Sequence, residues 1–131
     1  MLKHMINRRG QALVEFAIIF PLVIILLFGI YEIGIALSVQ QTITYAAREG
    51  ARIGALTNQN SQIEGAIRAA TEFIDESNER ITIQIIPEAE VGRDRGDELT
   101  VQIEYEMPLL ILTVISNDIT LTSQAVARIE I

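Results

Sequence analysis

Residues 8–53 read RRGQALVEFAIIFPLVIILLFGIYEIGIALSVQQTITYAAREGARI, and this stretch decides the fold. No residue from Phe16 to Tyr31 carries a formal charge, and an apolar-rich run of 26 residues extends from Ala12 to Leu37. At about 1.5 Å per residue, a helix of that length reaches about 39 Å. Because the hydrocarbon core of a bilayer is about 30 Å thick, the stretch predicts a membrane-spanning helix.

Charge is distributed unevenly on the two sides of this predicted span. The chain carries a net charge of −7, and its first ten residues hold Lys3, Arg8 and Arg9 but no acid. Taking those 3 from the 10 basic residues leaves 7 against 17 acids, a balance of −10. The positive-inside bias predicts a cytoplasmic N-terminus and a domain outside the cytoplasmic membrane. An acidic domain without a basic patch argues against nucleic-acid binding.

The composition also excludes several kinds of chemistry. The chain has no cysteine and only one histidine, His4. Disulfides, thiolate metal sites, histidine triads and multi-histidine metal sites are therefore impossible. The acidic loop from Pro87 to Glu98 lacks the EF-hand spacing, and no Walker motif or nucleophile elbow occurs. We predict no enzyme, no catalytic residue, no cofactor, no metal and no small-molecule substrate.

Beyond the span, helical periodicity continues and a second helix follows. Ser38–Ala55 carries small residues at helical spacing, which favour tight packing either against the domain or against a neighbouring subunit. Ser61–Asn78 predicts an amphipathic helix with Asn60 or Ser61 as N-cap. Its predicted apolar face consists of Ile63, Ala66, Ile67, Ala70, Phe73 and Ile74.

The remainder alternates apolar and polar residues with a period of two. Residues 81–85, 99–107 and 119–131 each predict a strand with one apolar face, hence a three-stranded antiparallel sheet covered by the helices. The expected fold class is α+β. The apolar segment Leu109–Asn117 is either a buried short element or an exposed patch that meets another subunit.

The N-terminal residues resemble a known processing signature. Basic residues, Gly10 and then an apolar helix with Glu15 five positions after the glycine look like a type IV-type prepilin. Phe16, Pro21 and the AAREGAR sequence of residues 46–52 occur with them, and the whole is similar to the TadE-like subfamily of pseudopilins from tight-adherence (Flp-type) pilus systems.

The resemblance implies cleavage after Gly10 by a prepilin peptidase, which makes Gln11 the mature N-terminus. It divides the chain into a leader (1–10), a transmembrane and assembly helix (11–37) and an extracytoplasmic α+β domain (38–131). Glu15 would pair with the α-amino group of a neighbouring subunit, and Phe16 and Pro21 would contribute to subunit assembly. Many type IV pilins carry Phe or Met where this chain has Gln11, and an N-terminal glutamine can cyclise and lose its charge.

Other residues of the span have simpler expected roles. Pro21 predicts a kink, because it lacks the N–H that bonds near Ala17. Tyr31 and Glu32 are expected at the outer membrane interface, with Glu32 as a buried subunit contact the alternative.

The implied function is a minor pilin-like subunit that helps assemble or prime a tight-adherence pilus. Its expected partners are the membrane, itself or other pilin-like subunits, the prepilin peptidase and the pilus platform proteins. Three alternatives stay open. They are a major filament subunit, an uncleaved single-pass anchor that displays a small binding domain, and a secreted binding protein cleaved near residues 36–38.

Overall fold

The described residues form two helices followed by three strands. A computed structural model describes residues 2–77, 79–88, 90, 92–110 and 118–131, with side chains from Gly10 onward. The elements are α1 (Leu2–Thr57), α2 (Asn60–Thr71), β1 (Ile81–Ile86), β2 (Glu98–Pro108) and β3 (Asp118–Arg128). This order confirms the predicted α+β class, with one long N-terminal helix.

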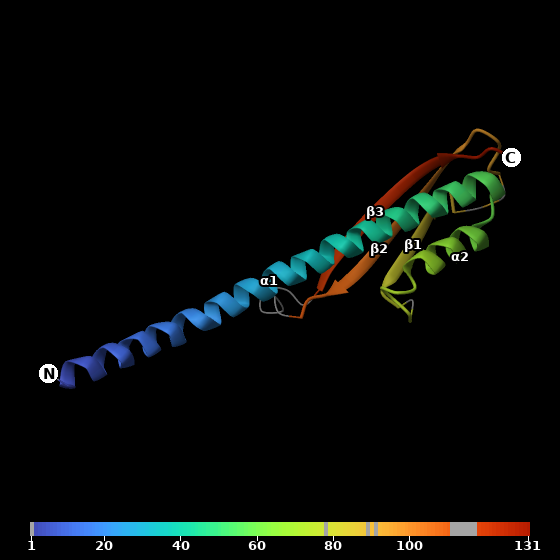
Figure 1. Cartoon of the computed structure of the whole chain (residues 1–131). Helices are drawn as coiled ribbons and strands as arrows, with labels where there is room; N and C mark the ends of the chain where they lie inside the picture. Colours follow the sequence, from blue (N-terminus) through green and yellow to red (C-terminus); the bar gives the residue numbers. More distant parts are fainter. Residues whose placement is uncertain (1, 78, 89, 91, 111–117) are drawn as a thin grey trace.

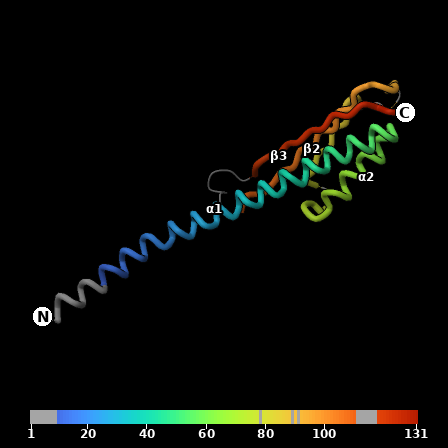
Figure 2. The backbone as a smooth tube through the Cα atoms, turned by 45° about the horizontal axis from the view of Figure 1, so that its top comes forward, coloured from blue at the N-terminus to red at the C-terminus, as the bar shows by residue number. Residues whose placement is uncertain are grey.

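Helix α1 is far longer than the rest of the molecule. Its N-terminal half projects alone, whereas its C-terminal half lies along the sheet with α2 beside it (Figure 1). The chain termini therefore lie at opposite ends of the molecule. Pro21 lies inside α1 and the helix continues through it, and neither Figure 1 nor Figure 2 shows a sharp bend where a kink was expected.

The three strands form one antiparallel sheet in the order β1-β2-β3. Ile83 pairs with Ile103, and Tyr105 pairs with Leu121. Burial alternates along β2, so the predicted period of two is confirmed. The buried face of β3 also includes Ser123, whose hydroxyl donates to the Thr44 hydroxyl of α1 at 3.1 Å.

Small residues of α1 bring the helix close to the domain. Ala46 and Ala47 are fully buried, and a Cβ atom built on Gly50 would lie 2.8 Å from the Ile67 side chain. One built on Gly54 would lie only 2.2 Å from Leu99. Of the two predicted roles for this stripe, packing against the domain is the one observed.

Helix α2 is shorter than predicted at its C-terminus. It ends at Thr71, whose hydroxyl donates to the Ile67 carbonyl at 2.9 Å, and the expected extension to residue 78 is wrong. The chain turns away because the buried Asp75 carboxylate accepts a hydrogen bond from the Arg80 N–H at 2.9 Å. Phe73 is therefore 77% exposed rather than part of the apolar face.

The N-terminus of α2 is capped from a distant loop. Gln59 is the N-cap residue and makes no side-chain cap, so the predicted caps at Asn60 and Ser61 are wrong. Instead, the Glu90 carboxylate accepts a hydrogen bond from the Asn60 N–H at 2.6 Å. An acid at this position also suits the positive end of the helix dipole.

A buried arginine organises the loop between β1 and β2. Arg93 donates to the carbonyl oxygens of Pro87 and Glu88 and to the side chain of Asn58. The loop is polar, as predicted. Most of the predicted Leu109–Asn117 segment (residues 111–117) lies outside the described residues.

Candidate assembly surface

The projecting half of α1 exposes a continuous apolar surface. From Leu13 to Tyr31 its large apolar side chains are 44–71% exposed, except for the half-buried Ile24. Soluble monomers rarely expose apolar patches larger than a few hundred Å². Within the described residues, α1 is the one helix long and apolar enough to cross a membrane, and its most apolar window makes no buried contact with the domain. The helix therefore indicates single-pass membrane anchoring.

The residues predicted for processing and assembly all lie on this projecting half. Gly10, Gln11, Glu15 and Pro21 are exposed, and nothing lies within 4 Å of a Cβ built on Gly10. Phe16 stacks on Phe20, with ring centroids 5.3 Å apart. All five positions are exposed in the described structure, so their predicted roles depend on other molecules and stay predictions.

Glu15 is the one charged residue between Gly10 and Tyr31. It makes no hydrogen bond or ion pair with any residue whose side chain the structure describes. A carboxylate within an apolar helical surface is costly in a bilayer unless a partner compensates its charge. Its geometry therefore leaves it available to a cation from outside the domain.

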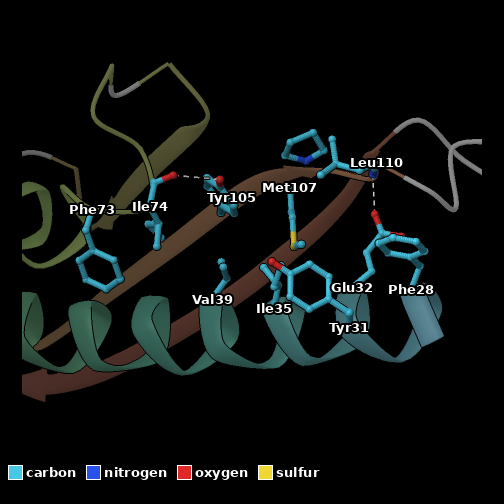
Figure 3. Close-up of a pocket in the computed structure, with 11 residues that line it drawn as sticks. Phe28, Tyr31, Glu32, Ile35, Val39, Phe73, Ile74, Tyr105, Met107 and Leu110 are labelled. Atoms are coloured by element: carbon cyan, nitrogen blue, oxygen red, sulfur yellow. Dashed lines mark hydrogen bonds between the residues drawn. The ribbon is translucent and has the colours of Figure 1, made fainter.

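Glu32 marks the point where α1 reaches the domain. It is 5% exposed, and its carboxylate accepts a hydrogen bond from the Leu110 N–H at 2.5 Å (Figure 3). The Glu32 carboxylate is therefore buried against its own domain and is not exposed to water at the membrane interface. It fastens the end of β2 to the start of the packed half of α1.

Beside this contact a groove opens between α1 and the domain. Its volume is about 410 Å³, and most of its lining is apolar. Figure 3 shows side chains from α1, from the turn after α2 and from the end of β2 pointing toward it. It is lined by Phe28, Tyr31, Glu32, Ile35, Val39, Phe73, Ile74, Tyr105, Met107, Pro108 and Leu110.

Sequence reasoning missed the groove because Phe73 fits the apolar period of α2 so well. Its spacing from Ile63, Ile67 and Ala70 predicts burial against the sheet, whereas the chain leaves the helix two residues earlier. Phe73 and Leu110 are each 77% exposed at the groove. Two bulky apolar side chains thus lie uncovered on the domain itself.

The polar part of the groove is engaged within the chain. The Tyr105 hydroxyl donates to the Ile74 carbonyl at 3.1 Å and thereby holds the turn after α2 over β2. Burial raises the pKa of the Tyr105 phenol; nearby Arg80 opposes this rise and Asp75 adds to it. The hydroxyl is thus kept protonated as a donor.

Replacing Tyr105 with phenylalanine should lower the free energy of unfolding by about 0.5–1.5 kcal/mol, because the Ile74 carbonyl loses its donor. The raised pKa means that the folded state favours the protonated phenol, so this stabilisation is present at neutral pH and is lost as the pH rises past about 10. Denaturation curves of Tyr105→Phe and of the native chain should therefore converge in alkali. Tyr45→Phe, at a residue 63% exposed, is the control; equal stabilities of the Tyr105 variant and the native chain at pH 7 would contradict the role of this bond.

Within the AAREGAR sequence of residues 46–52, Arg52 and Glu49 form an ion pair on the outer face of α1. Arg52 donates to Glu49 at 2.6 Å, and this hydrogen bond lowers the pKa of the glutamate and raises that of the arginine. Exposed pairs of this kind stabilise little. The part of the chain that the structure describes has no group of three or more metal-binding side chains.

Comparison with known protein families gives a match over the N-terminal part of the chain. Residues 10–52 match the family model described as TadE-like protein. No curated protein and no solved structure gives a significant match to the chain. The match spans the projecting half of α1 and most of its packed half, so it supports the resemblance seen in the sequence. It indicates a pilin-like protein associated with a tight-adherence pilus.

Proposed function

We propose that this chain is a minor pilin-like subunit that is held in the cytoplasmic membrane by α1 and used to assemble or prime a tight-adherence pilus. The observation that carries the proposal is the projecting half of α1. From Gln11 to Tyr31 its surface is apolar and exposed, the single side-chain charge there is Glu15, and the family match covers it. A pilin-like subunit would use this one surface in two environments, first in the bilayer and then against other subunits.

In the proposed mechanism the leader is removed before assembly. A prepilin peptidase cuts after Gly10, and the new α-amino group of Gln11 becomes a cation within an apolar surface. Because a lone carboxylate is costly there, Glu15 of one subunit pairs with this amine on a neighbour. The pair compensates both charges and sets the register between adjacent helices. Platform proteins of the pilus then move the subunits outward.

The orientation follows from charge. Three basic residues precede the span, and the remainder of the chain carries a balance of −10 from 7 basic and 17 acidic residues. Under the positive-inside bias, the leader lies in the cytoplasm and the domain lies outside. This topology places the Gly10–Gln11 bond near the cytoplasmic surface of the membrane, where the peptidase must reach it.

The competing function is that of an uncleaved single-pass anchor that displays the domain. The α+β domain buries its own core, with Ile43, Ile63 and Leu99 fully inaccessible, so it does not need a filament in order to fold. An anchor, however, has no use for an unpaired carboxylate at residue 15. The two functions differ in the fate of the first ten residues.

The test is the intact mass and N-terminal sequence of the protein from its native membrane. We expect a chain that starts at Gln11, that stays in the membrane fraction and that starts at Met1 when the peptidase is deleted. Gly10→Val should block cleavage. The chain itself leaves open space around Gly10, so an added side chain would interfere with the peptidase and not with the fold of the subunit.

Gly34→Val serves as the matched control, since Gly34 also lies on α1 with nothing within 4 Å of its Cβ position. That variant should be cleaved as usual. A start at Met1 in wild-type cells would refute the proposed processing and favour the anchor. A start beyond Ala36 would identify a secreted protein.

A further inference from the structure

We propose that the groove beside Glu32 is the docking site for the Phe16–Phe20 pair of a second copy of this chain. The inference rests on the proposed function, because it requires subunits that move relative to one another along α1. It assigns a head-to-tail contact: the projecting half of one subunit fits the domain half of a neighbour that lies farther along the filament than the one whose amine pairs with Glu15.

The two surfaces complement each other in shape and polarity. The groove has about 410 Å³ of mostly apolar space. A whole helix, about 10–12 Å across, is too wide for it, but two aromatic side chains are not. Phe16 and Phe20 are 62% and 49% exposed, and their stacked rings form one rigid projection. Exposed Phe73 and Leu110 would be covered by the same contact.

Helix geometry gives the displacement between the two copies. Both copies are inserted in one membrane in the same direction, so their helices run parallel. A shift of 15 residues brings Phe16 level with Tyr31 and Phe20 level with Ile35, and both of these positions line the groove. At about 1.5 Å per residue, the subunit that contributes Phe16 and Phe20 is displaced outward by about 22 Å from the subunit that contributes the groove. The contact therefore forms as a subunit leaves the bilayer.

Electrostatics favours the projecting half of α1 over another domain as the occupant. Outside its first ten residues, the chain has 17 acidic and 7 basic residues, and all but Glu15 of these acids lie from Glu32 onward. Two such domains placed face to face would repel each other. Between Gln11 and Tyr31 the only side-chain charge is that of Glu15, and the proposed cleavage adds one α-amino group of opposite sign. It is also the apolar surface that most needs a new cover once it leaves lipid.

A contact of this type is heterologous, since the two surfaces lie at different places on the molecule. Each subunit offers both an aromatic pair and a groove, so the contact does not close on itself and propagates as an open filament. The groove thus gives the domain, and not only the membrane helix, a direct part in assembly.

The natural absence of cysteine permits a direct test in cells that carry the pilus-assembly proteins. A chain with Phe16→Cys and Leu110→Cys should form a ladder of disulfide-linked multimers on oxidation. Within one chain the two positions cannot join, because residue 110 lies at the level of Glu32, 16 residues or about 24 Å from residue 16, whereas a disulfide needs Cα atoms within about 7 Å.

The matched control pairs Ile18→Cys with Leu110→Cys. Ile18 is 71% exposed on the same half of α1 but, at about 100° per residue, points about 200° away from Phe16. It should give no ladder. Adding Ile35→Trp to the first pair should fill the groove and remove the ladder, while membrane insertion and cleavage after Gly10 persist.

The outcomes separate this inference from the proposed function. Equal ladders from residues 16 and 18 would overturn the groove contact, as would the absence of a ladder in cells that still process the chain and make pili. A co-purified phospholipid that Ile35→Trp expels, without any ladder, would assign the groove to lipid and overturn the contact as well. A chain that is neither processed nor needed for pili would refute the proposed function and the contact together.

Discussion

Glu15→Ala is expected to lower the amount of pili on the cell surface at least about tenfold, while the protein remains in the membrane and is cleaved after Gly10. In the proposed mechanism the carboxylate compensates the amine of a neighbouring subunit. Without it, a charged amine enters an apolar surface unpaired, and each 1.4 kcal/mol of lost association free energy lowers an equilibrium constant tenfold. Pili in sheared fractions and N-terminal sequence from membranes give the two readouts.

Conservative variants separate charge from size at this position. Glu15→Asp keeps the carboxylate and should retain part of the assembly, whereas Glu15→Gln keeps the shape and should fail nearly as badly as alanine. Ile19→Ala, on the same face one turn later and 50% exposed, is the matched control for loss of side-chain volume. Normal piliation by Glu15→Ala would rule out the proposed pairing and favour a plain anchor.

The elements whose apolar residues recur with a regular period could be predicted from the sequence. Alternating Leu99, Val101, Ile103, Tyr105 and Met107 predicts one buried face, and all five are buried in β2. The stripe of small residues on α1 likewise predicts close packing. Each pattern lies within one element and shows which of its faces meets the core. The prediction therefore needs no knowledge of the element that packs against it.

Contacts between distant segments could not be predicted in this way. Glu32 and Leu110 are 78 residues apart, and nothing in the local sequence of either indicates the other. Arg93 is similar, because an arginine in a polar loop is normally solvated. Its burial depends on where the turns at Gly92 and Gly96, both with φ near +100°, direct the chain toward Asn58. The groove arises from such contacts and was missed for this reason.

The end of α2 shows the same limit within a single element. Apolar spacing carries the helix prediction through Phe73 and Ile74, whereas the structure ends it at Thr71. The competing interaction is the Asp75 carboxylate, which caps the backbone of Arg80 and holds the following turn. Asp, Asn and Ser favour such local bonds over continued helix. Asp75, in the acidic run after Phe73, is thus the residue that signals the end of the helix.

The close approach of α1 to the domain makes Gly54 the most sensitive position of the packed half. A Cβ atom there would lie 2.2 Å from the Leu99 side chain and 2.9 Å from Ile63, both of which are fully buried. Both side chains are packed in the core, so the side chains, the helix or the strand must shift to accommodate the added atom. Gly54→Ala should therefore lower the free energy of unfolding by about 1–3 kcal/mol, a large part of the 5–15 kcal/mol typical of a domain.

Gly65→Ala is the matched control, because Gly65 lies within α2 with nothing within 4 Å of its Cβ position. That variant should gain about 0.5–1 kcal/mol from the better helix propensity of alanine. Chemical denaturation of the full chain in detergent, followed by circular dichroism, measures both. The double variant with Gly54→Ala and Leu99→Ala should lose less stability than the sum of the two single variants. Leu99→Ala removes the side-chain atoms that a Cβ at residue 54 would meet. Strict additivity, or an unchanged stability of Gly54→Ala, would mean that α1 does not lie this close to β2 at Gly54.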